Sequence, residues 1–264
     1  MPSADDPRLD QLKFLVLYAR LASIQLGTLV NLYRYHDIKR LVHVHGDDVK
    51  AKGNDSLAAT LVAGVKALPT AGHGRDAEID PPASLAALFQ EHDLARSLKP
   101  KLWLSFDLRA EAARICGMLT ACDFIRDDAL STSRLTQQYC TQHQLPRFDA
   151  TWTLVDVVAS DKRGSAALML LHCIVAATRA KKAGLVSIAV TAGGKALYQS
   201  CGFDVSTSWK EGGGVRTLAF CRLSDIHLGA LHTRLRVHSK LLAETCVREG
   251  LTARTSDRLV GRCN

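Results

Sequence analysis

The sequence predicts an α/β fold with a central, mixed and mainly antiparallel β-sheet. The hydrophobic pattern changes near residue 100, where segments of strand length replace helical periodicity. Residues 148–159 (FDATWTLVDVVA) are rich in β-branched side chains and apolar enough to form a strand in the middle of a sheet. A helix is expected over 164–182 and a strand over 185–191, so helices and strands alternate in this part of the chain.

Further strands complete the predicted sheet. They are expected in four other segments of strand-like composition, at 102–108, 113–124, 205–209 and 215–222. The first two are expected to pair antiparallel, and the last two to form a hairpin across three consecutive glycines. A short helix over 194–200 is expected to precede that hairpin.

Helices are expected before the sheet-forming segments, and the segment after them is expected to be helical as well. Apolar positions at helical spacing predict a helix over 8–36, and two more over 56–68 and 82–98 after a short strand at 40–45. A polar insertion is expected over 127–147. The chain therefore divides into an N-terminal helical extension, a sheet-containing domain and a basic helical C-terminal extension, at residues 1–39, 40–224 and 225–264.

Composition and charge limit the kinds of protein that this chain can be. It has 264 residues, of which 47% are hydrophobic and 23% are charged, and these values exclude a disordered or collagen-like chain. Residues 1–100 contain 12 Lys and Arg against 12 Asp and Glu, so the whole net charge of +8 lies in residues 101–264. A basic half attracts phosphate-rich ligands, which include nucleic acids, anionic surfaces and nucleotide-bearing cofactors.

The cysteines and histidines do not predict a metal site. The eight cysteines include no Cys-x-x-Cys pair, which argues against zinc-ribbon and thioredoxin-like proteins. His43 and His45 alternate on an expected strand, but no third ligand is placed beside them. We therefore expect no metal, mostly buried and reduced thiols, and an intracellular location, which is the cytoplasm with an organelle as the alternative.

The apolar segment 14–32 is long enough to raise the question of a membrane span. Arg20 and Gln25 interrupt it, and acidic rather than basic residues precede it. We expect a helix that packs in the core or docks on it. The alternative is a membrane-associated or targeting helix, and with it a peripheral membrane protein anchored by residues 14–32.

The segment most informative about function is residues 157–167 (VVASDKRGSAA). Here a buried strand ends, a short polar loop turns, and a helix of small residues begins. The free N–H groups at a helix N-terminus suit a phosphate, and small residues let a ligand approach the backbone. Lys162 and Arg163 add positive charge at this turn. The segment therefore predicts a phosphate-binding turn.

A second segment, residues 191–203 (TAGGKALYQSCGF), places Tyr198 four residues before a Gly-Phe pair. Together the two segments resemble the acetyl-CoA-binding core of the GNAT superfamily of N-acetyltransferases. In that family a loop of the type Arg-Gly-x-Gly-x-Gly/Ala holds the pyrophosphate, and a helix ending in Leu-Tyr-x-x-x-Gly-Phe follows. The resemblance is best over 152–203 and extends through the order of elements over about 40–224. It implies a GNAT-type fold, with acetyl-CoA as co-substrate and an amine as acceptor.

The resemblance also implies roles for individual residues. Tyr198 corresponds to the general acid that protonates the departing thiolate. The backbone of Val158 corresponds to the strand end that pairs with the pantetheine arm and the acetyl carbonyl. The residues expected to contact the coenzyme are Val157, Val158, Arg163, Gly164, Ser165, Ala166 and Ala167.

Two positions depart from the family pattern. With the loop pattern laid on Arg163 and Gly164, its third small position is Leu168. With the pattern shifted by two, Gly164 and Ala166 fit its last small pair, but its arginine position becomes Asp161. Thr191 stands where an asparagine is often found.

A base must also deprotonate the amine. Asp156 is our candidate, since it precedes Val158 by two residues and alternation places both on one strand face. Asp107 and Glu111 are alternatives.

A second function remains open at this point. The departures and the basic C-terminal segment, with seven Lys and Arg against four acidic residues over 225–264, suit a catalytically weakened GNAT-like domain. Such a domain would serve as a binding or scaffold module, in contact with an acidic or nucleic-acid partner through this tail. The sequence contains no signature of a particular amine acceptor.

Overall fold

The computed structural model describes residues 7–34, 101–111, 114–123, 141, 148, 151–211, 213–226 and 228–251. Several predicted segments lie outside the described residues, namely the strand at 40–45, the helices at 56–68 and 82–98, and the insertion at 127–147 apart from Thr141. His43 and His45 lie outside them as well.

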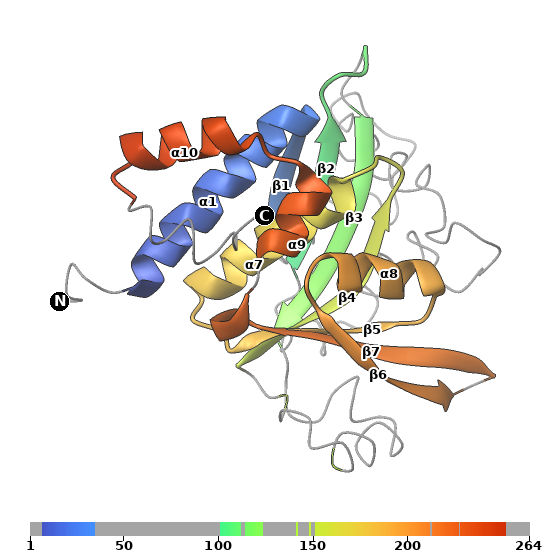
Figure 1. Ribbon diagram of the computed structural model, residues 1–264. Helices are drawn as coiled ribbons and strands as arrows, with labels where there is room; N and C mark the ends of the chain where they lie inside the picture. The colour runs from blue at the N-terminus through green and yellow to red at the C-terminus, as the bar shows by residue number, and fades with distance from the viewer. Residues whose placement is uncertain are drawn as a thin grey trace.

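In the described part of the chain, seven strands form one mixed sheet in the order β1-β2-β3-β4-β5-β7-β6 (Figure 1). Their bounds are Thr28–Arg34 (β1), Lys101–Asp107 (β2), Arg114–Asp123 (β3), Trp152–Ser160 (β4), Gly184–Ala189 (β5), Asp204–Glu211 (β6) and Gly214–Arg222 (β7). Only the β4–β5 pair is parallel among these neighbours. The predicted α/β class with a mixed, mainly antiparallel sheet is therefore confirmed, as is the hairpin formed by the last two strands.

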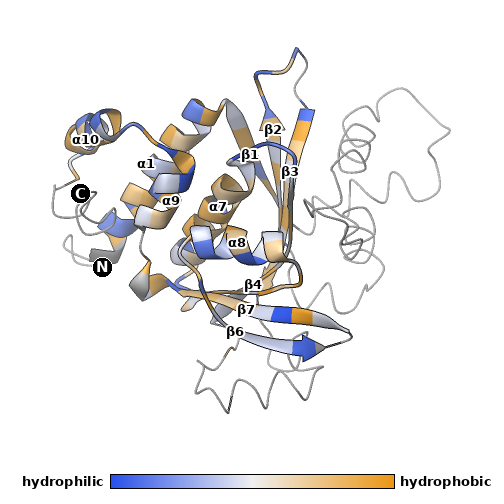
Figure 2. Ribbon diagram, turned by 45° about the vertical axis from the view of Figure 1, so that its right-hand side comes forward, coloured by the Kyte–Doolittle hydropathy of each residue, from blue (hydrophilic) through white to orange (hydrophobic). Residues whose placement is uncertain are grey.

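Helices cover one face of this sheet, as Figure 1 shows. They are α1 (Pro7–Leu26), α7 (Ser165–Arg179), α8 (Ala192–Ser200), α9 (Leu228–Leu235) and α10 (Ser239–Arg248), with a 3-10 turn at Leu223–Asp225. The central helix is α7, which contacts β2, β3 and β4 on one side and α1 and α9 on the other. Its sequence is apolar almost throughout, and Figure 2 shows hydrophobic residues along its length.

The helix predicted over 8–36 ends at Leu26, so that prediction is wrong for residues 27–34, and residues 35 and 36 lie outside the described residues. Gly27 has a φ of +59°, and its N–H donates to Ile24 O at 3.1 Å. A left-handed glycine terminates a helix and redirects the chain. The next residues (TLVNLYR) form β1, which pairs antiparallel with β2. The apolar composition of this segment is compatible with a helix. It forms a strand because Gly27 ends α1 and because β2 offers an edge with which the segment pairs.

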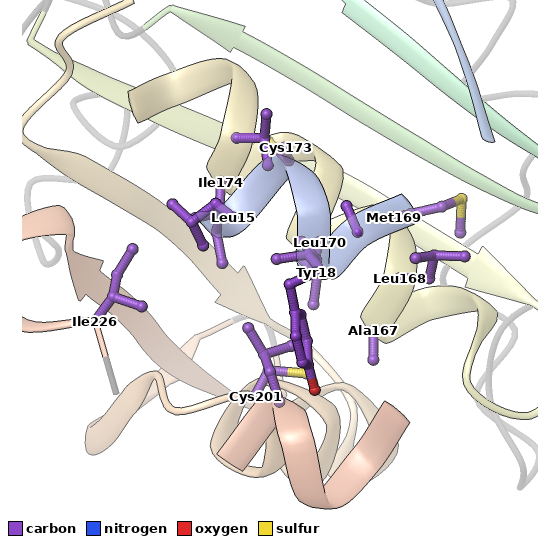
Figure 3. Packing of buried hydrophobic residues seen from close by; sticks show 14 of the residues in the cluster. Leu15, Tyr18, Ala167, Leu168, Met169, Leu170, Cys173, Ile174, Cys201 and Ile226 are labelled. Carbon is purple, nitrogen blue, oxygen red and sulfur yellow. The ribbon is translucent and has the colours of Figure 1, made fainter. Parts of the chain in front are cut away.

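The N-terminal helix is part of the main hydrophobic core. Phe14, Leu15 and Tyr18 of α1 are fully buried and pack in the same cluster as Leu170 and Ile174 of α7. Figure 3 shows Leu15 and Tyr18 beside α7. The expected division at residue 39 thus separates α1 and β1 from a core and a sheet to which both contribute. Within the described ranges, no helix combines the length and the apolar character needed to cross a membrane.

The C-terminal extension, expected to be helical, folds as the two helices α9 and α10. Arg236, with a φ of +51°, follows α9 and turns the chain toward α10. Two polar contacts tie this corner to α1: Gln25 Nε2 donates to Arg236 O, and His238 N–H donates to Gln25 Oε1 at 3.2 Å. Tyr18 Oη also lies 3.1 Å from His232 Nδ1. The N-terminal helix α1 is therefore hydrogen-bonded to α9 and to the corner between α9 and α10.

One buried histidine on α7 makes stability depend on pH. Nε2 of His172 is buried without a hydrogen-bond partner among the described residues, and burial lowers the pKa of His172 from 6.5 to about 4. Between these values the unfolded chain binds more protons than the folded one, so stability falls as the pH falls from 6.5 to 4. The loss expected from this group is about 3 kcal/mol.

We expect His172→Leu to lack this contribution, because leucine does not titrate and leaves no orphaned nitrogen. Urea unfolding at pH 7 and at pH 4 should show a smaller difference in the variant than in the wild type. An equal difference in the two proteins would contradict the assignment.

Candidate functional site

The parallel strands β4 and β5 separate halfway along their length. Backbone pairing runs from Trp152–Gly184 to Leu154–Val186 and then stops, although both strands continue (Figure 1). From Val155 to Ser160 the β4 edge that faces β5 has no strand partner among the described residues. A ligand with an extended amide-containing arm can pair with such an open edge.

A β-bulge in β4 accompanies this separation. Thr120 of β3 pairs with Val157 and Ala121 pairs with Val155, so Asp156 is an extra residue in β4. A bulge bends a strand and increases its twist, and bulges are frequent beside active sites. The regular alternation on which the prediction for Asp156 relied is interrupted at this residue. Val158 pairs with Leu119 beyond the bulge and packs against the helix-side core.

The open strand leads directly into the first turn of α7. Gly164 is the N-cap residue, with a φ of +87° that favours glycine, and α7 begins at Ser165. Leu168 N–H donates to Gly164 O at 2.9 Å, which is the first helical hydrogen bond. No acceptor within the described part of the chain is recorded for the N–H groups of Arg163, Gly164, Ala166 and Ala167. These four donors lie at the positive end of a 15-residue helix.

Ser165 has a different role from its neighbours in this turn. Its N–H donates to Lys162 O at 3.0 Å, and its fully buried hydroxyl lies against Ser105 Oγ. Cys116 Sγ is 3.4 Å from Ser105 Oγ and 3.7 Å from Ser165 Oγ. A Cβ at Gly117 would lie 2.6 Å from Ser105 Oγ, so glycine is required for this close approach. The cluster thus attaches the first turn of α7 to β2 and β3.

The positive charge predicted beside this turn is mostly paired within the protein. Lys162 Nζ lies 2.6 Å from Asp107 Oδ1, and both side chains are largely buried. The hydrogen bond from Lys162 holds the pKa of Asp107 below its ordinary value. Asp161, at the start of the loop, pairs with Arg114 at 2.6 Å. Arg163 is exposed, so it is the loop cation that faces solvent.

These pairings also bear on the alternative base candidates. Asp107 accepts from both Lys162 Nζ and Arg109 N–H, which leaves its carboxylate a poor proton acceptor. Leu168, at the third small position of the loop pattern, is fully buried in the core cluster and does not fill the turn. The departure at this position therefore leaves the surface of the turn open.

Tyr198 lies on α8 beneath the point where β4 and β5 separate. Thr191 is the N-cap of α8, and its Oγ1 accepts from Gly194 N–H at 3.0 Å. The Tyr198 ring packs against Phe203, with centroids 5.2 Å apart, and its hydroxyl lies 2.7 Å from Ser187 Oγ. Ser187 Oγ is also 2.7 Å from Val155 O, across the strands just past their last backbone pair.

The structure brings several predicted residues together and adds one that sequence reasoning missed. The backbones of Val157 and Val158, the turn at 163–167 and Tyr198 all flank the opening between β4 and β5. Ser187 was not predicted, because a single serine in the strand sequence GLVSIA carries no motif. Its only sequence signal is that it is a hydroxyl residue in an otherwise apolar strand.

Two buried cysteines on or next to the helices of this site have unreactive thiols. Cys201 follows α8 and is buried in the core, and burial raises the pKa of its thiol to about 12. Cys173 of α7 is buried as well, with its pKa raised to about 12 for the same reason. Both thiols remain protonated at neutral pH, so they are packing groups rather than nucleophiles.

Fold and site together define an α/β protein with a split parallel strand pair next to the N-terminus of a central helix. No protein-family model matches the chain, and no curated protein matches it in sequence. Solved structures of similar shape include AtaTR bound with AcCoA, at 12% identity and a TM-score of 0.40, with 76% of this chain and 97% of that one covered.

Two other solved structures are similar over a comparable part of the chain. The ribosomal-protein-S5-alanine acetyltransferase from Vibrio fischeri has 11% identity and a TM-score of 0.40, over 75% of this chain and 94% of that one. The AHL synthase LasI has 11% identity and a TM-score of 0.44, over 78% and 95%.

Proposed function

We propose that this chain transfers an acetyl group from acetyl-CoA to an amine, by direct attack of the amine on the thioester. The observation that carries this proposal is the β4 edge that has no strand partner among the described residues. This edge leads from the Tyr198 hydroxyl to the N–H groups of the first turn of α7, which have no acceptor in the same part of the chain. An extended amide-containing arm with a pyrophosphate at one end and a thioester at the other matches that sequence of groups.

The residues of the turn fit the phosphate end of such a molecule. The N–H groups of Arg163, Gly164, Ala166 and Ala167 have no acceptor among the described residues and can donate to phosphate oxygens. Small side chains at three of these positions permit close approach. The exposed Arg163 side chain supplies a cation. Ser165 contributes through its buried contact with Ser105, which holds the turn in place.

The strand end fits the thioester end. The backbone of Val157 and Val158 would pair with the pantetheine arm, and a backbone N–H of β4 would donate to the oxyanion that forms on attack. Tyr198 would act as the general acid, and Asp156 as the base that takes the amine proton, directly or through water. The acceptor is an amine of a class that the site does not define.

The test is calorimetric titration with acetyl-CoA of the wild type and of Gly164→Glu. The glutamate places bulk and negative charge at the phosphate turn, and its Cβ would lie 3.2 Å from Leu26 Cδ2. We expect the wild type to bind acetyl-CoA with micromolar affinity. The variant should lose at least about a hundredfold in affinity, because the glutamate carboxylate and the pyrophosphate are both negative and meet in a partly desolvated site.

Gly213→Glu is the matched control. Gly213 has a φ of +82°, close to that of Gly164, and lies in the β6–β7 turn with open space around the position of its Cβ. It should have the same backbone cost and retain acetyl-CoA binding. Equal loss of binding in both variants would show that backbone strain, not occupation of the turn, is responsible. Absence of wild-type binding at millimolar acetyl-CoA would contradict the proposed function.

One observation favours a binding module as a second candidate function. A surface hollow of about 300 Å³ lies between α1, the end of α7 and the segment after α10, away from the first turn of α7. Its lining has an apolar floor with three basic and one acidic side chain, from Leu12, Lys13, Val16, Leu17, Arg20, Arg179, Glu249 and Leu251. A module of this kind would bind an acidic partner in a salt-dependent manner without binding acetyl-CoA.

A further inference from the structure

The two hydrogen bonds of Ser187 have a defined direction. A carbonyl oxygen can only accept, so the Ser187 hydroxyl donates to Val155 O at 2.7 Å. The same hydroxyl donates to Tyr198 Oη, also at 2.7 Å. A serine hydroxyl has one hydrogen, so these two acceptors share it.

The two hydrogen bonds of Ser187 are buried, and they lie at the point where β4 and β5 separate. Ser187 is 0% exposed and Tyr198 is 5% exposed. The last backbone pair of β4 and β5 joins Leu154 to Val186, and the Ser187 side chain makes the next connection between the two strands. The tyrosine hydroxyl is thereby held where the open part of the β4 edge begins.

We propose that Ser187 is a positioning residue that makes Tyr198 an effective proton donor. In the free protein the hydrogen of the Ser187 hydroxyl is shared between Val155 O and Tyr198 Oη. During acyl transfer the bond between the tyrosine oxygen and its hydrogen breaks, and a new S–H bond forms on the departing thiolate. Ser187 then turns its own hydrogen from Val155 O to the phenolate oxygen, and it keeps that proton throughout. This inference rests on the function proposed above.

The geometry allows this exchange without movement of the backbone. Val155 O and Tyr198 Oη both lie 2.7 Å from Ser187 Oγ, so rotation about one side-chain bond redirects the hydrogen. Because the site is buried, a donor aimed at a new negative charge has a large effect. Ser187 would thus serve the reaction through Tyr198 and touch neither acetyl-CoA nor the amine.

The test is a double-mutant cycle with Ser187→Ala and Tyr198→Phe in acetyl-transfer assays. Ser187→Ala should lower kcat by about ten- to hundredfold, the range for loss of one hydrogen bond to a charged oxygen. The KM for acetyl-CoA should change by less than about threefold. In the Tyr198→Phe background the same change should have almost no further effect, since its partner hydroxyl is already absent.

Two additional measurements separate positioning from a merely structural role. The alkaline limb of the pH–rate profile should move to higher pH in Ser187→Ala, because the phenolate form loses its donor. Ser187→Cys keeps the size of the side chain with a weaker donor, and its kcat should fall between those of the wild type and Ser187→Ala. Thermal unfolding of each variant reports any loss of the fold.

The outcomes distinguish this inference from the proposed function. If the wild type neither binds acetyl-CoA nor transfers acetyl groups, the proposed function fails. If the wild type is active but Ser187→Ala lowers kcat equally in the wild-type and Tyr198→Phe backgrounds, the positioning role is overturned. Unchanged kcat and an unchanged pH profile in Ser187→Ala would overturn it as well.

Discussion

Replacing Tyr198 with phenylalanine should lower kcat for acetyl transfer by at least about a hundredfold, the usual contribution of a positioned general acid. The affinity for acetyl-CoA should change by no more than a few-fold, because the ring still packs against Phe203 and the phosphate turn is untouched. Stability should also change little. Ser187 keeps its bond to Val155 O in the variant, so no buried donor is left unpaired.

The measurement is a steady-state rate against a panel of amines, together with calorimetric affinity for acetyl-CoA. Tyr33→Phe is a matched control, since Tyr33 lies on the edge strand β1, at the far end of the strand order from β5. It should leave both quantities unchanged. Full activity in Tyr198→Phe would show that another group protonates the leaving thiolate, and Tyr198 would then be a packing residue of α8.

Replacing Phe14 with alanine should destabilise the fold by about 3–5 kcal/mol, which is the range for truncating a fully buried aromatic side chain. Phe14 is fully buried on α1, its ring stacks near Tyr18 with centroids 6.0 Å apart, and it belongs to the cluster that contains α7. Its loss leaves a cavity between two helices that both cover the sheet. The measurement is the free energy of unfolding from urea titration.

Ile24→Ala on the same helix is the control for this experiment. Ile24 is 73% exposed, so its truncation should change the free energy of unfolding by no more than about 0.5 kcal/mol. If Phe14→Ala were as mild as this control, α1 would be a separable extension rather than part of the core. That result would agree with a domain beginning near residue 40.

Much of the region from residue 100 to 222 could be predicted from local pattern alone. The expected helix at 164–182 and strand at 185–191 correspond to α7 and β5, and the strands expected at 102–108 and 113–124 correspond to β2 and β3. These elements are apolar and buried over most of their length, and the length of each apolar run separates the helix from the strands. The expected strand 148–159 begins later in the structure, at Trp152.

The ends of the chain were less predictable because their elements depend on distant partners. Residues 28–34 are apolar enough for a helix, and they became a strand because Gly27 ends α1 and β2 provides an edge. The C-terminal leucines likewise belong to two helices, and contacts with Gln25 and Tyr18 of α1 accompany the turn between them. Local propensity alone does not contain such partners.

The sequence by itself determined the chemistry that the chain presents: a strand followed by a turn of small residues, and a tyrosine ahead of Gly-Phe. Only the tertiary structure decided where these groups lie. The extra residue at Asp156 and the end of pairing at Leu154–Val186 open the strand edge, and both features arise from register between strands. Contacts between distant segments likewise place Ser187 between Val155 and Tyr198. They also pair Lys162 with Asp107 in a salt bridge. These contacts depend on how strands and helices pack together, and no spacing along the chain encodes them.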